Sequence, residues 1–173
     1  VLSGDIDAER RVLGILIKHP SKVDEVVDRL TVDYFVDGVH RAIYQTILHL
    51  YQQQGRISYT QIYNHLRQEG KVPSPDSALI SLTEAFATTA ELEPSIEALT
   101  DSYARRKIYL AAEQIQKAVL ESTDEPVSAL QAMAQELIFR ATRLEQGGDD
   151  VKELIQVLDK CFAELVERQE GKR

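Results

Sequence analysis

The side chains best suited to metal binding are few in this sequence and show no recognisable ligand pattern. No histidine is spaced from a second histidine or a carboxylate as metal ligands usually are, so we expect no metal site. Cys161 is the single cysteine, which excludes a thiolate cluster and an internal disulfide. The histidines are His19, His40, His49 and His65.

The sequence also lacks the patterns expected of nucleotide-binding and nucleophilic sites. The pairs Gly70-Lys71 and Gly171-Lys172 lack the upstream glycine and the following hydroxyl of a phosphate-binding loop. No Ser or Cys stands in a nucleophile-elbow pattern. The 28 acidic residues fall mainly on predicted solvent-facing sides of helices, where they favour solubility and i,i+4 pairing. We therefore expect no catalytic residue and no cofactor site in these 173 residues.

Basic residues form two small groups in a chain whose net charge is −8. An acidic chain has little affinity of its own for a phosphate backbone, which argues against autonomous binding of nucleic acid. Residues 56–71 could imitate a helix-turn-helix segment, although any short capped helix that ends in glycine gives this pattern. The run Arg105-Arg106-Lys107 is expected to be a solvated helix face, or with Tyr103 and Tyr109 a partner-binding patch.

Composition indicates an all-α fold. The chain has only 8 Gly and 5 Pro, which favours long helices with short connections. The longest apolar runs are a few residues, so no membrane-spanning segment is expected. The single cysteine fits a reducing, cytoplasmic location.

Residues 1–93 are predicted to form a compact head of about five helices, which would position the residues of any site. Pro20 should end the first helix and Ser21 cap the second, while Gly55 and Gly70 follow the third and fourth. The last helix should bury Leu79, Ile80, Leu82 and Phe86. The helices are expected at 7–18, 21–30, 38–54, 59–69 and 76–88.

The second predicted region, residues 94–144, is a long antiparallel helical hairpin. One helix should run from Pro94 to about Ser122, because proline suits a first turn and no later breaker follows. The turn at 124–126 then leads to a helix over 127–144. Long helices joined by so few residues should fold back on each other.

The third predicted region, residues 145–173, is a flexible linker followed by a separate amphipathic helix. The segment 145–150 is rich in glycine and charge, and 151–168 carries a sharp apolar stripe. Because a single helix of this length is marginal in water, the stripe needs a covering partner. Its residues are Val151, Leu154, Ile155, Leu158, Phe162 and Leu165.

Two sequence blocks resemble the N-terminal region of DnaB-type replicative helicases. The first is Ile6-Asp7-Ala8-Glu9-Arg10-Arg11-Val12-Leu13-Gly14-Ile15-Leu16, which is followed by Pro20. The second contains Phe35, His40-Arg41-Ala42-Ile43-Tyr44, Ile47, Leu50-Tyr51, Gly55 and Ile57 in the order and approximate spacing of the family. The layout of head, hairpin, linker and amphipathic helix is also similar.

The resemblance implies a non-catalytic assembly and recruitment region of an enzyme. Members form hexameric rings in which these regions pair through their hairpins into a trimer of dimers, and this collar binds primase and a loader. An ATPase domain using ATP and Mg²⁺ would follow residue 173, and single-stranded DNA would be bound only by the intact ring.

The resemblance also assigns roles to individual residues. Tyr109 and Ile115 fall on positions near the primase contact. The dimer seam is expected at Leu130, Leu137, Ile138 and Leu144, and the linker helix should dock on a neighbouring ATPase domain through Leu154, Ile155, Leu158, Phe162 and Leu165.

Two other classes of function remain open at this point. One is a free-standing DNA-binding regulator that uses residues 56–71. The other is a helicase loader or adaptor that has borrowed the helicase head.

Overall fold

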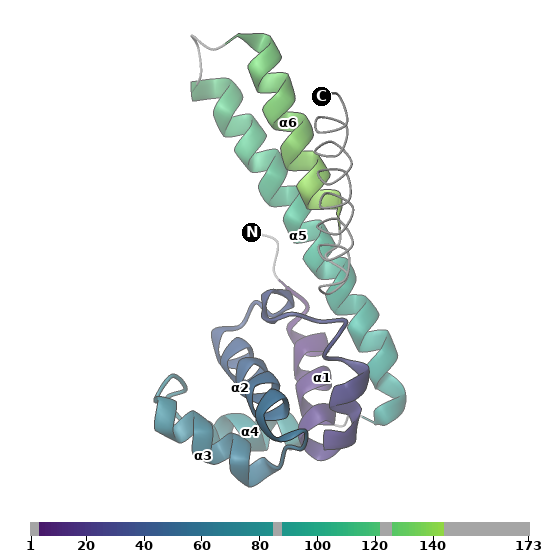
Figure 1. Cartoon of the computed structure of the whole chain (residues 1–173), viewed down its shortest axis with the longest axis vertical. Helices are drawn as coiled ribbons and strands as arrows, with labels where there is room; N and C mark the ends of the chain where they lie inside the picture. Colours follow the sequence, from purple (N-terminus) through teal and green to yellow (C-terminus); the bar gives the residue numbers. More distant parts are fainter. Residues whose placement is uncertain (1–3, 85–87, 122–125, 144–173) are drawn as a thin grey trace, which may run out of the picture. The chain divides into compact units, whose positions relative to one another are not determined.

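The regular structure of the described residues is helical throughout. The computed structural model describes residues 4–84, 88–121 and 126–143, which belong to one compact unit. Four α-helices form a head: α1 (Ile6–Lys18), α2 (Gly38–Gln54), α3 (Tyr59–Glu69) and α4 (Pro75–Glu84) (Figure 1). Two short 3₁₀ turns, η1 (Pro20–Glu25) and η2 (Val32–Tyr34), connect α1 to α2. The predicted all-α fold is confirmed.

Local capping chemistry sets the boundaries of the head helices. The Asp37 carboxylate accepts the backbone N–H groups of Val39 and His40 at the start of α2, at 2.8 and 3.0 Å. These backbone hydrogen bonds hold the pKa of Asp37 below its usual value. Gly55 and Gly70 end α2 and α3 in the left-handed conformation that glycine adopts without strain. The predicted helices 38–54 and 59–69 are therefore confirmed.

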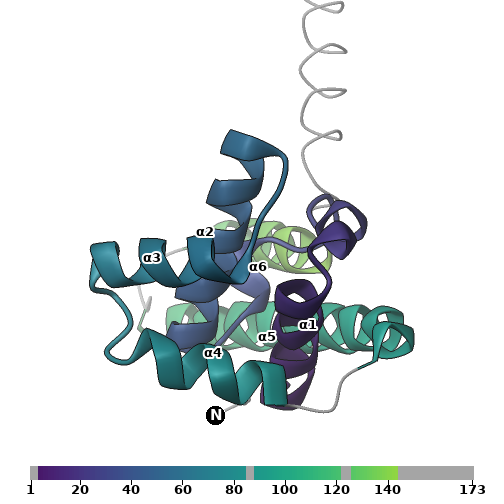
Figure 2. The same cartoon turned by 90° about the horizontal axis from the view of Figure 1, so that it is seen from below.

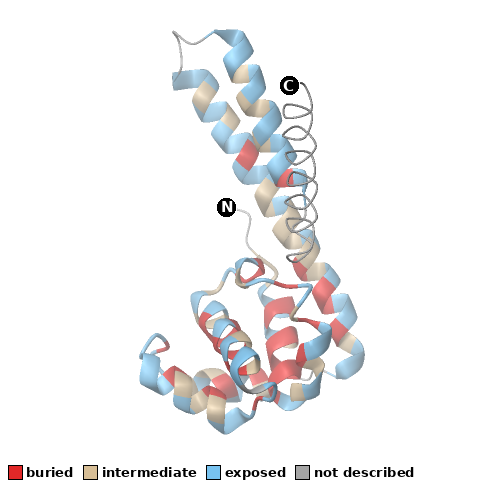
Figure 3. Cartoon of the chain, viewed as in Figure 1, coloured by how far each residue is buried: buried red, intermediate tan, exposed pale blue. Residues whose placement is uncertain are grey.

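The hydrophobic core lies inside the head. The apolar faces of α1 and α2 meet there, and Figure 3 shows the buried residues concentrated on these helices. Figure 1 places α3 and α4 at the end of the head away from α6, and the view from below in Figure 2 shows them in front of the hairpin helices. Residues of the core that are less than 2% exposed include Val12, Leu13, Leu16, Ile43, Ile47, Ile62 and Leu66.

The segment after α1 differs from the predicted second helix. It is a 3₁₀ turn that begins at Pro20, and His19 stands at its cap position instead of Ser21. Val23 and Val26 are buried as predicted, but the tighter turn brings them to α1 without a full α-helix. The Tyr44 hydroxyl donates a 2.8 Å hydrogen bond to the Leu30 carbonyl, which satisfies the backbone where this segment ends.

Helix α4 buries fewer residues than its sequence pattern predicts. Leu79 and Leu82 are buried, but Ile80 is 46% exposed, so its predicted burial is wrong. A helix of ten residues that packs on one side turns the residue next to Leu79 about 100° away from the core. Phe86, the fourth residue expected there, lies outside the described residues.

The hairpin consists of α5 (Leu92–Glu121) and α6 (Val127–Thr142), which run side by side in opposite directions (Figures 1 and 2). Helix α5 begins two residues before Pro94, because a 3₁₀ turn (Thr89–Glu91) with a Thr88–Glu91 capping box leads into it. Pro94 then lies in the first turn, where its missing N–H is tolerated. The small side chains of Ala111 and Ala141 are buried in the hairpin.

Gly14 lets α1 and α4 approach closely. A Cβ atom on Gly14 would lie 2.5 Å from the Leu82 carbonyl oxygen, a backbone atom that cannot move aside by changing a rotamer. By contrast, a Cβ atom on Gly38 would meet nothing within 4 Å. Both glycines lie in helices, so the two sites differ mainly in the space available.

We predict that Gly14→Ala lowers the free energy of unfolding by about 1–3 kcal/mol, because the added methyl group forces α1 and α4 apart. Gly38→Ala is the matched control and should leave stability unchanged or raise it by up to about 1 kcal/mol, as expected for alanine in a helix. Urea denaturation followed by circular dichroism would measure both. Equal stability of the two variants would show that the close approach is unimportant.

Candidate functional site

Two histidines that are distant in sequence lie together between α2 and α3. The ring centroids of His49 and His65 are 4.9 Å apart, and Glu69 Oε2 is 3.9 Å from His65 Nδ1. Spacing along one helix cannot reveal the first of these contacts, whereas the i,i+4 spacing of His65 and Glu69 is the sequence signal that could have indicated the second. In residues 4–84, 88–121 and 126–143, no group of three or more potential ligands is arranged to hold a metal ion.

A buried carboxylate joins the two sequence blocks that carry the family resemblance. Glu9 of α1 is fully buried, and its Oε1 accepts the Val36 N–H at 2.6 Å. Its Oε2 lies 2.7 Å from His40 Nδ1 and accepts the Asp37 N–H at 3.4 Å. A buried carboxylate is costly unless it is paired, and these partners satisfy it. We call this group the Glu9 clamp.

Other residues of the second block also stabilise the head. Arg41 forms a 2.7 Å ion pair with Asp33. The Phe35 and Tyr44 rings stack with centroids 4.5 Å apart, and burial raises the pKa of the Tyr44 hydroxyl above its usual value. The motif therefore determines where the segment before α2 packs.

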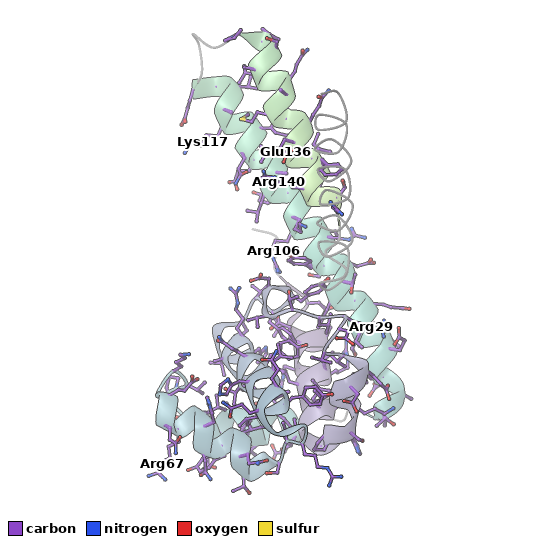
Figure 4. The ribbon with its side chains drawn as sticks, viewed as in Figure 1. Arg29, Arg67, Arg106, Lys117, Glu136 and Arg140 are labelled. Atoms are coloured by element: carbon purple, nitrogen blue, oxygen red, sulfur yellow. The ribbon has the colours of Figure 1, made fainter. Side chains whose placement is uncertain are left out.

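The first turns of α5 are tied to the head by charged and polar contacts. Arg29 forms a bidentate pair with Glu93, at 2.7 and 2.6 Å, next to the start of α5 (Figure 4). The Arg29 guanidinium lowers the pKa of the Glu93 carboxyl through this hydrogen bond. Arg11 donates from Nε to Ser95 Oγ at 3.2 Å. These contacts fix the direction in which α5 leaves the head.

The basic run on α5 is largely used for structure. Tyr103 stacks on Tyr34 with ring centroids 4.3 Å apart, and Arg106 donates to the Asp33 carbonyl (Figure 4). Lys107 donates to the Arg143 carbonyl at 2.9 Å, where α6 ends. The expectation of a solvated face is therefore wrong for Arg106 and Lys107, whose partners lie far away in sequence.

The residues expected in the dimer seam fall on different sides of α6. Leu130 and Leu137 are half-buried, and their spacing places them with Ala141 on the side that faces α5. Ile138 is 53% exposed, and Val127 and Phe139 are exposed as well. Leu144 lies outside the described residues. Whether these residues form a dimer seam stays a prediction.

The two residues expected at a primase contact are also separated. Tyr109 is 43% exposed on α5, whereas Ile115 is half-buried on the side that faces α6. The sequence did not indicate that Ile108, Val119 and Leu120 are exposed as well. All six residues of the predicted linker-helix stripe, Val151, Leu154, Ile155, Leu158, Phe162 and Leu165, lie outside the described residues.

The segment considered for DNA binding forms a capped helix but offers little positive charge. Helix α3 contributes Arg67, and Lys71 after it pairs with Glu69 at 3.2 Å.

Across the described residues, none of the helices is both long and apolar enough to cross a membrane.

Comparisons with known proteins agree on one family. The model described as the DnaB-like helicase N-terminal domain matches residues 1–101. The chain is 26% identical over 105 residues to the replicative DNA helicase DnaB of Rhodothermus marinus, covering 60% of the chain and 11% of that protein. It is 25% identical over 145 residues to the replicative DNA helicase DnaB of Synechocystis, covering 80% of the chain and 16% of that protein. The chain thus spans a small part of these relatives.

A solved structure supports the same fold. The crystal structure of the N-terminal domain of DnaB helicase from Mycobacterium tuberculosis superposes with a TM-score of 0.72 at 20% sequence identity. The match covers 79% of this chain and 97% of the other.

We predict that Glu9→Ala lowers the free energy of unfolding by about 1–3 kcal/mol, because buried N–H donors lose their acceptor. Glu9→Gln should lose less, since its amide oxygen can still accept one of these hydrogen bonds. Urea denaturation gives the stabilities, and amide hydrogen exchange at Val36 and Asp37 reports the contact itself. Unchanged exchange in Glu9→Ala would contradict the clamp.

Proposed function

The chain belongs to the DnaB-like helicase N-terminal domain family, and we propose that it is the assembly and partner-recruitment region of a hexameric, ATP-dependent replicative DNA helicase. The family match over residues 1–101 carries this proposal. The region itself would be non-catalytic. ATP and Mg²⁺ would be bound by a separate ATPase domain, and single-stranded DNA by the assembled ring in the cytoplasm.

We propose that the hairpin mediates self-association into dimers, and that three dimers build the hexameric collar. The support is the exposed apolar side chains of α6, because Val127, Ile138 and Phe139 are 69%, 53% and 58% exposed. Large apolar side chains grouped on a projecting hairpin are typical of a protein interface. Ile138 is common to this surface and to the seam expected from the sequence.

Recruitment of primase, and of a helicase loader, is proposed for the exposed side of α5. Tyr109 is accessible there and can contribute both apolar area and a hydroxyl group. Ile115 would contribute indirectly, by packing between the two hairpin helices. The regulator and adaptor alternatives have no specific observation in their favour.

The amphipathic segment 151–168 is proposed to dock on the ATPase domain of a neighbouring subunit. Its support is the sequence: the stripe lies beyond a glycine-rich linker and needs a partner to cover it.

We expect the double variant Ile138→Asp/Phe139→Asp to weaken self-association by at least about tenfold, because buried interface positions would then carry charge. Ile80→Asp is the control, since Ile80 is similarly exposed but lies on α4. Sedimentation velocity over a concentration series measures the association. A wild-type protein that remains monomeric at high concentration would refute the proposed hairpin seam.

In the intact helicase, Leu158→Asp should shift the population from hexamers to smaller species while the head stays folded. Gln156→Asp, on the opposite side of the predicted helix, should leave hexamers unchanged. Native mass spectrometry would count subunits, and circular dichroism would check folding. Persistence of hexamers in Leu158→Asp would rule out the docking role.

A further inference from the structure

We propose that one side of α5 docks an amphipathic helix of a partner protein, and that a basic end of that helix enters an acidic cleft between α1 and α5. The proposal rests on the recruitment role proposed above and deepens it, because it specifies the chemistry of the partner. Two features carry it: the spacing of exposed residues along α5, and the charge of the cleft at one end of that row.

The exposed row on α5 follows the spacing of a helix-packing seam. Its members recur at intervals of three and four residues, which is the spacing of positions that interlock when two helices pack side by side. Their exposure is high: Ile108 is 51%, Val119 56% and Leu120 71% exposed. We call this row the docking ridge; it consists of Arg105, Ile108, Tyr109, Ala112, Gln116, Val119 and Leu120, all exposed.

The docking ridge is distinct from the two sides of α5 that are already occupied. Leu92, Ile96 and Leu99 are buried against the head. Ala111 and Ala118 lie on the side that packs against α6, where the first is buried and the second half-buried. Because a helix presents its residues at about 100° intervals, the ridge occupies the remaining side.

The cleft continues the same side of α5 toward the head. It has a volume of about 640 Å³, and α5 lines it with Ala98, Asp101, Ser102 and Arg105. These four residues extend the three- and four-residue spacing of the ridge, and Arg105 belongs to both. The opposite wall is the start of α1, including Asp5 and Asp7. A helix lying along the ridge would therefore reach the cleft with its end.

The negative charge of the cleft favours a partner helix that has a positively charged end. Three carboxylates, from Asp5, Asp7 and Asp101, face one guanidinium, from Arg105. The formal balance of −2 favours a lysine or arginine side chain, and one Asp5 oxygen is already engaged with the Ala8 N–H at 2.9 Å. From Ala98 to Leu120 the surface is about 33 Å long, which matches a helix of roughly 22 residues.

The test uses two synthetic helical peptides of equal length. Both carry leucines at alternating intervals of three and four residues; one has two arginines at each end, the other two glutamates. Placing the charges at both ends makes the result independent of the direction in which the peptide binds. Fluorescence anisotropy with labelled peptides measures affinity for the whole chain.

We expect the arginine peptide to bind on the order of tenfold more tightly than the glutamate peptide. Tyr109→Asp and Val119→Asp should each weaken binding by about tenfold. Leu110→Asp is the matched control, because Leu110 is 47% exposed but lies off the ridge, and it should bind as the wild type does. Asp101→Arg should reduce or reverse the preference between the two peptides.

Three results would overturn the proposal. The first is equal affinity for the two peptides, and the second is an equal loss of binding in Leu110→Asp. The third is loss of self-association in Tyr109→Asp and Val119→Asp, which would make the ridge an interface between copies of this chain. The proposed hairpin seam is tested separately by Ile138→Asp/Phe139→Asp, so either idea can fail alone. Circular dichroism of each variant checks that it folds.

Discussion

Helix α5 belongs to the head and to the hairpin at once, and the placement of the hairpin surfaces depends on how α5 is anchored. Its first turns are held by Arg29 and Arg11, and a turn or two further on Tyr103 stacks on the head while Arg106 donates to a head carbonyl. Several short contacts spread along four turns resist tilting better than one strong contact would. Because the same helix continues unbroken to Glu121, the head sets the direction of the hairpin. The hairpin surfaces are thereby presented at a fixed distance from the head.

The anchoring itself relies on a head whose connections are held by buried polar contacts. The Glu9 clamp ties α1 to the segment before α2, and that segment supplies both Tyr34 and the Asp33 carbonyl that receive α5. A buried carboxylate rarely improves stability by itself, but it specifies one arrangement of its donors. The sequence blocks that carry the family resemblance thus hold in place the segment on which α5 packs. Their residues hold the connections of the head in place.

The parts of this fold that could be predicted from sequence are those set by neighbouring residues. Helices α2 and α3 were placed correctly because the glycines that end them, Gly55 and Gly70, stand next to them in the chain. Contacts between residues far apart in the chain leave no such local pattern in the sequence. His49 contacts His65 of another helix, and Lys107 donates to a carbonyl 36 residues away. For the same reason the spacing of residues could not reveal that α5 has three separate sides. Tyr109 and Ile115, which were expected at one interface, lie on two of these sides.

The distribution of side-chain size within the hairpin argues that it is completed by other proteins. Its inner contact buries the alanines Ala111 and Ala141 and half-buries Ile115, Leu130 and Leu137, whereas other large side chains such as Leu120 and Phe139 are exposed. A hairpin optimised to be stable alone would place its largest apolar groups inside, where their burial contributes most. The two alanines let the helices approach closely where they meet, while several large apolar side chains stay outside. That arrangement sacrifices stability of the isolated chain, and it is favourable when association covers the outer surface.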